Sequence, residues 1–461
     1  MNSIRKSIHK FKREQAFRRD ASLIEKNITC RVLIVLHLYY LEEWDEIREY
    51  LKSLTCYPYK LVITYPVEME TKVRRLNITE AMDNVELQAY PNRGYDVAPF
   101  IFALQKENLD SYDVVFKLQT KGTKRRIFIY DQLFLGRDWF TNLFEGIVGE
   151  QTVHNVIDIL MHQPDTALVA ADNLLVSDPV YKVRIVQEEL GKRGITVPDR
   201  YKFAAGSCFA ASAKYLQMFL EDIRPLDLKA EDFHPMDAAR GFSLAHLLER
   251  YLCIAVSAHG YRMQGMKVCG FRRAFRKPLE KLCRRFSSQR LLELPYHIDE
   301  HFFLWQLDNQ FVLYRLRKVK LSQLMYFYPN PPQLLQMKDF FPYRYLKGDT
   351  KAYAEYCRFH EEHGLPSMSP ERFDALIRSL NENGYDQKNI ILISEFDTIL
   401  DGQHRACWMA YRNGLDYEMQ MLEVTILNAR RAVEELIPRP VRIMLEKRYL
   451  RKQCILDRKK V

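Results

Sequence analysis

The sequence predicts an α/β protein whose first half forms an open, Rossmann-like parallel sheet. From residue 31 onward, short apolar runs alternate with longer amphipathic stretches, a pattern typical of parallel strands covered by helices on both faces. Two of these runs lead into polar segments that contain glycine. In open α/β sheets such segments lie at the carboxyl ends of strands, where ligands bind. A second alternation beyond residue 343 predicts a smaller α+β module.

Five strands are predicted in the first half, each a short run of apolar or β-branched residues. They are Val32–Leu38, Lys60–Thr64, Val85–Ala89, Val114–Leu118 and Ala167–Ala171. The stretch Glu42–Leu54, between the first two, has the spacing of an amphipathic helix. We therefore expect successive strand–helix units whose strands lie parallel in one sheet.

Composition limits the class of protein. The chain has 461 residues, of which 47% are hydrophobic, so it is long enough for two or three folded domains. Its nine cysteines include no CxxC pair, which argues against a disulfide framework or a zinc ribbon. No run of about 18 apolar residues and no signal-peptide core occurs. We expect a reduced, cytoplasmic protein.

The net charge of +10 is unevenly distributed. Basic residues concentrate in residues 1–27, 262–290 and 441–460. The first segment predicts a basic amphipathic helix, which either binds an anionic membrane surface or leans, solvated, on the protein body. Membrane binding would make the protein peripheral on the inner face of the plasma membrane. The expected order is a basic helix over 1–29, an α/β domain over 30–265, a helical connector over 266–342, a smaller module over 343–428 and a basic helix over 429–461.

The first polar segment, Asn92-Arg93-Gly94-Tyr95-Asp96, follows the third predicted strand. A glycine here suits a positive φ or a close approach of the backbone to a ligand. Asp96 stands at a plausible N-cap, and Pro99 would then lie in the first helical turn, where its missing N–H costs least. The segment is a candidate ligand-binding turn at the edge of the sheet.

The second polar segment, Lys117–Gly122, follows the buried run Val114–Phe116. It presents Lys117 and Lys121 on either side of Gln119, and two lysines at this spacing suit an anion. The alternative is that one lysine points to the opposite face of the strand. No Asp-x-Asp occurs in the chain, so we predict a diphosphate held by lysines and no metal site.

These segments also carry a resemblance. NRGYDVAPF, YDVVFKLQTKGTK and the following Arg137-Asp138-Trp139 resemble the hallmark blocks of the rhamnan synthesis protein F family. The resemblance runs from Leu33 to about Gly260. It implies a type A glycosyltransferase fold and a hexosyltransferase-like enzyme of surface-polysaccharide or lipopolysaccharide synthesis. Such an enzyme would move rhamnose or a related deoxysugar from a nucleotide-diphosphate donor to a glycan or lipid-linked acceptor, with no tightly bound cofactor.

The resemblance also assigns a donor site. Tyr201–Ser212 resembles a family block in which a glycine lets substrate approach the backbone, and Gly206 and Ser207 match it. A lone histidine at the end of the first strand could reach a donor or could be purely structural. The candidate donor-binding residues are His37, Asn92, Arg93, Gly94, Asp96, Lys117, Gln119, Lys121, Gly206 and Ser207.

An inverting transferase needs a carboxylate that removes the proton of the acceptor hydroxyl. The segments around Asp232 and Ser243–Arg250 resemble a family region, but Gly241 stands where that region carries an aspartate. Asp237, one helical turn earlier, is therefore the first candidate for the base, with Asp232 and Asp96 behind it. Each of the three could instead be a surface or capping carboxylate.

The stretch 266–342 is rich in basic and aromatic residues. We expect a helical connector that packs its aromatic residues on the first domain. The alternative is stacking on nucleic acid.

The second module contains a predicted helix, Pro370–Asn383, an apolar strand, Asn389–Ser394, and a helix that begins near Gln403. A glycine followed by a helix N-terminus favours phosphate. The segment resembles the helix–strand–strand–GxHR unit of the ParB/sulfiredoxin-like fold, which implies that Gly402 permits close phosphate approach and that Arg405 contacts it. The candidate phosphate-binding residues are Asp401, Gly402, Gln403, His404 and Arg405.

Several functions are open for this module. ATP or CTP are candidate ligands, and a scaffold without catalysis is an alternative. A ParB-like protein could bind nucleic acid, but no helix-turn-helix signature follows, so nucleic acid is not expected. A sugar or glycan kinase could use Glu395, Asp397 and Asp401 as base or magnesium ligands.

Overall fold

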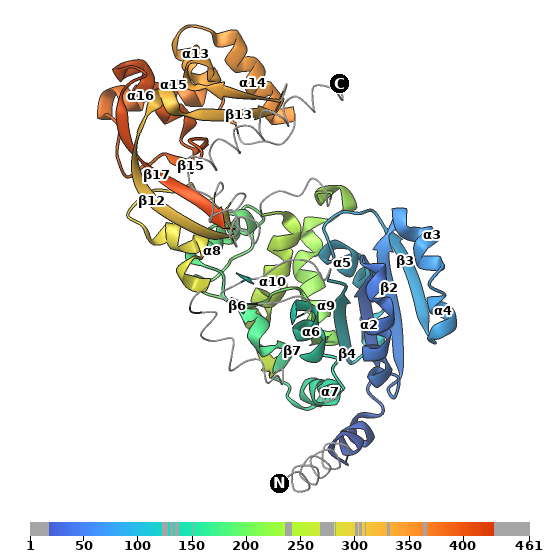
Figure 1. Ribbon diagram of the computed structural model, residues 1–461. Coiled ribbons are helices and arrows are strands. Elements are labelled where there is room, and N and C mark those ends of the chain that lie inside the picture. The colour runs from blue at the N-terminus through green and yellow to red at the C-terminus, as the bar shows by residue number, and fades with distance from the viewer. Residues whose placement is uncertain are drawn as a thin grey trace, which may run out of the picture. The chain divides into compact units, whose positions relative to one another are not determined.

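The computed structural model divides the chain into two compact units, Met1–Lys277 and Pro278–Val461 (Figure 1). It describes residues 18–121, 128–129, 132–133, 138–150, 152–235, 242–267, 281, 283–299, 303, 307–308, 310–329, 332–362 and 367–427. Most of the expected N-terminal helix and the whole C-terminal helix over 429–461 therefore lie outside the described residues. Residues 18–27 form the described part of the first helix.

The first unit is built on a seven-stranded sheet with the order β11-β7-β10-β4-β1-β2-β3. The strands are β1 (Val32–His37), β2 (Tyr59–Pro66), β3 (Val85–Tyr90), β4 (Val114–Gln119), β7 (Thr166–Ala171), β10 (Phe209–Ser212) and β11 (Arg262–Met266). All five predicted strands are confirmed. Parallel pairing joins β3, β2, β1 and β4, and also β7 and β11. The sheet is not wholly parallel, because β10 runs antiparallel between β4 and β7.

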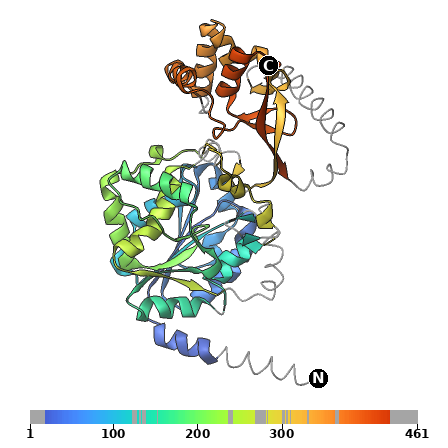
Figure 2. The same cartoon turned by 90° about the vertical axis from the view of Figure 1, so that its left-hand side faces the viewer.

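Helices cover both faces of this sheet (Figures 1 and 2). One face carries α5 (Val97–Lys106), α8 (Val180–Gly191), α9 (Ala213–Ile223) and α10 (Leu244–Ala258). The other carries α2 (Trp44–Leu51), α6 (Asp138–Glu145) and α7 (Val153–His162). The predicted helical stretch Glu42–Leu54 is confirmed as α2 flanked by two short 3-10 turns, Leu41–Glu43 and Lys52–Leu54. Short helices α3 (Glu70–Arg74) and α4 (Ile78–Ala81) connect β2 to β3.

Alternation along the central strands divides the core into two layers. In β1, Leu33 and Val35 pack with α5 and α10, whereas Ile34 and Leu36 pack with α2 and α6. Both sets are buried, as expected for a strand covered on both faces. The next residue on the α5 side is His37, so a polar side chain enters this layer where the strand ends.

The second unit has a four-stranded sheet with the order β12-β17-β15-β16. Its strands are β12 (Phe311–Lys320), β15 (Leu392–Ser394), β16 (Ile399–Asp401) and β17 (Glu418–Leu427). A separate hairpin joins β13 (Met325–Pro329) and β14 (Pro332–Gln336). Its helices are α13 (Phe341–Leu346), α14 (Thr350–Glu362), α15 (Pro370–Asn383) and α16 (Gln403–Asn413).

The helical connector expected over 266–342 is wrong. That range contains β12, β13 and β14, and β12 belongs to the sheet of the second unit, which therefore begins before residue 343. β12 pairs over its whole length with β17, about a hundred residues later in the chain. Only Val312 and Val319 of this strand are buried, so its side chains do not alternate between buried and exposed as those of a half-buried strand do. The strand is defined by its distant partner.

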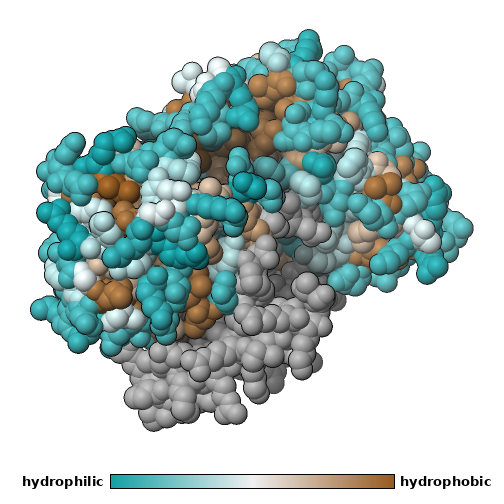
Figure 3. Space-filling model, turned by 90° about the horizontal axis from the view of Figure 1, so that it is seen from above, coloured by the Kyte–Doolittle hydropathy of each residue, from teal (hydrophilic) through white to brown (hydrophobic). Residues whose placement is uncertain are grey.

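On the face shown in Figure 3, hydrophilic residues predominate and apolar patches of different sizes lie among them. Within the described ranges, no helix combines the length and the apolar character that crossing a bilayer requires.

Candidate functional site

The candidate site lies at the carboxyl ends of β1, β2 and β4, on the face covered by α5 and α10. In the strand register, His37 stands beside Thr64 of β2 on one side and Gln119 of β4 on the other. Lys117 lies two residues before Gln119 and therefore on the same face. The sequence thus places four polar side chains at one edge of an otherwise apolar layer.

An ion pair between Lys117 and Asp96 forms the centre of the site. The Lys117 ammonium donates to the Asp96 carboxylate and, at 2.8 Å, to the backbone carbonyl of Ser207. Both side chains are buried, 3% and 9% exposed. Burial by itself would raise the pKa of Asp96, but the Lys117 and Lys121 ammonium groups outweigh it and hold that pKa below its usual value. The pair is therefore a charged pair inside the protein.

This pairing changes the interpretation of both residues. Asp96 occupies the N-cap position of α5, as predicted, but its side chain makes no capping hydrogen bond. Lys117 points toward α5, and Asp96 and Ser207 already occupy its ammonium. Lys121 is partly exposed, and its backbone N–H donates to the Glu43 carboxylate at 2.8 Å. Of the two lysines, Lys121 is the one whose side chain can meet a ligand from solvent.

Gly94 has the positive φ that the sequence suggests, +68°. Its lack of a side chain, however, serves packing: a Cβ atom here would lie 2.5 Å from the Ala98 Cβ and 2.6 Å from the Phe233 ring. Arg93 donates to the Phe233 carbonyl at 2.9 Å, and Gly94 donates to the His234 carbonyl at 3.1 Å. The turn is thus fastened to residues 233–234 next to the site. Asn92 is partly exposed on the same turn.

The turn between β9 (Phe203–Ala204) and β10 contributes Gly206 and Ser207. Both have positive φ, +86° and +52°. The Gln119 side chain donates to the Gly206 carbonyl at 2.5 Å, so this turn is held to β4. A Cβ atom on Gly206 would lie 2.9 Å from the Trp139 ring. Neighbouring side chains therefore fill the space beside Gly94, where the sequence allowed a ligand to approach, and the space beside Gly206, which the resemblance assigns to substrate.

His37 is buried and neutral. Its Nδ1 lies 3.0 Å from the Thr64 hydroxyl, and burial, aided by the Lys117 and Lys121 charges, lowers its pKa to about 4. His246 of α10 stacks edge-on with Tyr95, and burial, aided by the Arg250 charge, lowers its pKa to about 3. Both imidazoles are thus hydrogen-bonding groups at neutral pH.

Sequence reasoning missed a carboxylate that the fold adds to the site. The Ser207 hydroxyl donates to Glu249 of α10 at 2.5 Å. The other Glu249 oxygen lies 2.9 Å from the Arg250 guanidinium, which also pairs with Asp178 at 2.7 Å. The Glu249 side chain is 15% exposed, whereas those of Arg250 and Asp178 are almost fully buried. An adjacent glutamate and arginine within the apolar helix α10 was the available signal.

The three predicted base candidates have different surroundings. Asp96 lies in the site, as described above. Asp232 is exposed and accepts the Lys229 N–H at 2.7 Å, where it caps a short 3-10 turn. Asp237 and Gly241 lie outside the described residues. The structure thus brings together His37, Asp96, Lys117, Gln119, Gly206 and Ser207 and leaves Asp232 apart.

In the described part of the chain, no three His, Cys, Asp or Glu side chains lie close enough together to hold one metal ion. The prediction of lysines in place of a metal stays a prediction.

In the second unit, Gly402 is the N-cap of α16 and has a φ of +86°. The side chains that follow it face the protein. His404 Nε2 lies 2.7 Å from the Tyr353 hydroxyl, and burial lowers the pKa of His404 to about 3. Arg405 donates to the Asn389 carbonyl at 2.6 Å and to Asp401 at 3.3 Å. Gln403 is buried against Tyr356.

The carboxylates considered for a kinase lie on β16 and on the turn before it. Asp397 pairs with Arg317 of β12, and Arg317 also pairs with Glu423 of β17 at 2.8 Å. Glu395, two residues before Asp397 in the chain, is buried. Asp401 pairs with Arg405, and burial raises its pKa despite that charge. Asp397 and Asp401 thus serve ion pairs within the fold.

Comparison with known proteins bears on the first unit. Residues 16–261 match the family model described as Rhamnan synthesis protein F. Two strains of Xanthomonas campestris pv. campestris each contain a relative, named Uncharacterized protein WxcX, that is 26% identical over 268 residues. The alignment covers 54% of this chain and 34% of each relative, so the chain spans about a third of their length. Since the family match covers more than half of the chain, the protein belongs to the rhamnan synthesis protein F family, which links it to polysaccharide synthesis.

Proposed function

We propose that the first unit is a glycosyltransferase with a type A-like fold that transfers a sugar from a nucleotide-diphosphate donor to a polysaccharide or lipid-linked acceptor. Rhamnose or a related deoxysugar is the proposed sugar. The observation that carries the proposal is the polar cluster at the carboxyl edge of the sheet, where Asp96, Lys117, Ser207 and Glu249 form one connected network. Ligands of open α/β sheets bind at this edge.

Glu249 is the base in this proposal. Asp96 is less suitable, because its side chain is only 9% exposed and pairs with the buried Lys117 ammonium, which leaves an acceptor hydroxyl little access to it. Glu249 retains some exposure, and Ser207 and Arg250 fix its two oxygens. The acceptor hydroxyl oxygen would form a bond to the anomeric carbon of the donor sugar as the bond to the diphosphate breaks. The hydroxyl proton would pass to Glu249.

The leaving diphosphate carries the developing negative charge. Lys121 has a partly exposed side chain beside the site and would balance that charge without metal coordination. Lys117 would act indirectly, by holding Asp96 and the Ser207 turn in place. In this scheme the positive charge comes from side chains of the chain itself.

The test uses purified full-length protein, labelled deoxythymidine-diphosphate sugars and extracted lipid-linked oligosaccharides. We expect transfer by the unaltered protein and a loss of at least about 100-fold in kcat for Glu249→Gln, the usual scale for removing a general base. Donor binding and Tm should persist in that variant. Asp232→Asn is the matched control, because Asp232 is exposed and caps a separate turn.

Two results would count against the proposal. No transfer from any donor by a folded protein would refute the enzyme function. Full activity of Glu249→Gln would refute only the role of Glu249 and would direct attention to Asp237.

Nucleotide binding or kinase activity in the second unit finds less support. His404 and Arg405, the side chains that such a site would use, form hydrogen bonds within the unit. Binding of a phosphate group by this unit would then depend on the backbone N–H groups of the first turn of α16. We propose that this unit positions the acceptor or a partner, with ATP and CTP titration of the full-length protein as the check.

A further inference from the structure

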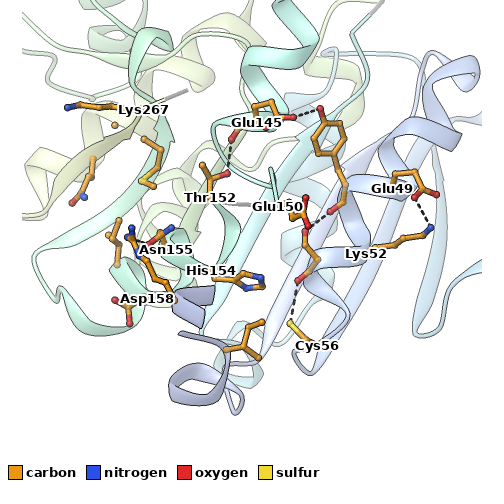
Figure 4. A pocket seen from close by; sticks show the side chains of 18 of the residues that line it. Glu49, Lys52, Cys56, Glu145, Glu150, Thr152, His154, Asn155, Asp158 and Lys267 are labelled. Carbon is orange, nitrogen blue, oxygen red and sulfur yellow. Dashed lines mark hydrogen bonds and ion pairs between the residues drawn. The ribbon is translucent and has the colours of Figure 1, made fainter. Parts of the chain in front are cut away.

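A large pocket in the first unit lies apart from the candidate site. It has a volume of about 1540 Å³ and is lined by the helix at residues 18–27, by α2, by the α6–α7 turn, by α7 and by β11 (Figure 4). α2, α6 and α7 cover the face of the sheet opposite to α5 and α10. The pocket shares no lining residue with the Asp96–Lys117 network.

Hydrogen-bonding groups and apolar atoms share the lining. Fifteen of the twenty lining residues are polar or charged, so the pocket can make many hydrogen bonds to a ligand that also presents apolar surface. Figure 4 shows Glu145, Thr152, His154 and Asn155 around the same hollow. Tyr50 donates to Glu145 at 2.8 Å, which orients both a ring and a carboxylate.

His154 adds a neutral ring. Its Nδ1 lies 2.8 Å from the Tyr57 hydroxyl, and its other nitrogen, Nε2, bonds to no residue in the described ranges. Burial lowers the pKa of His154, so the ring is uncharged at neutral pH. The imidazole can therefore offer one hydrogen bond to a ligand without adding charge.

The charge of the lining decides between classes of ligand. It contains five carboxylates, from Glu46, Glu49, Glu145, Glu150 and Asp158. Against these stand three basic residues, Arg19, Lys52 and Lys267. A net negative lining disfavours nucleotide phosphates, nucleic acid and anionic lipid head groups, which need an excess of cations.

We propose that this pocket binds a neutral oligosaccharide, as a second glycan site apart from the site of transfer. Carboxylates and amides form hydrogen bonds with the many hydroxyl groups of a sugar chain, and an aromatic ring can pack against the apolar C–H face of a sugar. Pockets for drug-sized ligands measure about 300–1,000 Å³, so this one has room for an extended chain. The choice of a glycan rests on the proposed function, and the pocket would hold a growing acceptor chain while its end is extended elsewhere.

The experiment titrates full-length protein with a neutral rhamnose-containing oligosaccharide of several residues and observes binding by saturation-transfer NMR and calorimetry. Heparin-derived oligosaccharide is the polyanionic comparison. The test variant is the double substitution Asn155→Ala with Gln264→Ala, because both amides line the pocket. Gln217→Ala on α9 is the matched control on the opposite face.

We expect the neutral oligosaccharide to bind and the double variant to bind it at least tenfold more weakly, with Tm retained and Gln217→Ala unchanged. In transfer assays, the double variant should raise KM for long acceptors and leave short acceptors unaffected. Equal affinity of the folded double variant, or preference for heparin, would overturn the proposal. Oligosaccharide binding through this pocket without any transfer would support the glycan site and count against the transferase, so the two failures are distinguishable.

Discussion

Replacing Asp96 with asparagine should destabilise the first unit strongly. The change leaves the Lys117 ammonium buried with only the Ser207 carbonyl and an amide as partners. Removing one partner of a buried ion pair costs about 3–5 kcal/mol, because the remaining charge is uncompensated. In a unit of this size each kcal/mol lowers Tm by about 2–4 °C, so we expect a decrease of roughly 6–20 °C.

Thermal and urea unfolding, followed by circular dichroism, would measure this loss. The matched control is Glu188→Gln, because Glu188 and Lys192 form a surface pair with side chains 69% and 55% exposed. Such a pair contributes about 0–1 kcal/mol. The double substitution Asp96→Asn with Lys117→Met removes both charges, and it should recover about 2 kcal/mol or more relative to the sum of the single changes.

The pH dependence supplies a second check. Because the folded pKa of Asp96 is depressed, its stabilisation is present above the unfolded carboxyl pKa of about 4 and is lost as pH falls through the folded value. The deficit of Asp96→Asn should therefore shrink in acid. A loss no larger than that of Glu188→Gln at neutral pH, or strict additivity in the double variant, would refute a charged buried pair.

Three further results are expected. Burial lowers the pKa of His37 to about 4, so the free energy of unfolding of the wild-type protein should fall as pH drops from about 6.5 to 4. His37→Gln should remove roughly 3 kcal/mol of that fall, measured by urea titrations at each pH. The same pH profile of stability in wild type and variant would contradict the burial of a neutral ring. Gly94→Val should cost roughly 2–5 kcal/mol of stability through backbone strain and overlap with Ala98 and Phe233. Gly194→Ala is the control, because Gly194 has a φ of +77° but open space around it, and it should cost about 1 kcal/mol. Equal losses of stability in thermal unfolding would contradict the packing argument. Lys121→Ala should weaken donor binding at least tenfold. Transfer by the wild-type protein should persist in excess chelator. Loss of transfer in chelator that manganese restores would show that a metal is required.

The sequence by itself determined the framework of the first unit. The five predicted strands and the helix Glu42–Leu54 follow from local alternation and helical spacing, which depend only on neighbouring residues. The positive φ of Gly94 and the N-cap position of Asp96 were likewise readable, because each is a local property of the chain. Family membership also came from local blocks of residues.

Only the tertiary structure decided the pairings between distant residues. Asp96 meets Lys117, Ser207 meets Glu249 and β12 meets β17 across long separations in sequence, and no local pattern specifies such partners. The antiparallel placement of β10 is of the same kind. Asp96 could therefore be predicted as a cap or a catalyst, but its burial against an ammonium arises because α5 and β4 pack together, and packing joins residues that the sequence keeps apart.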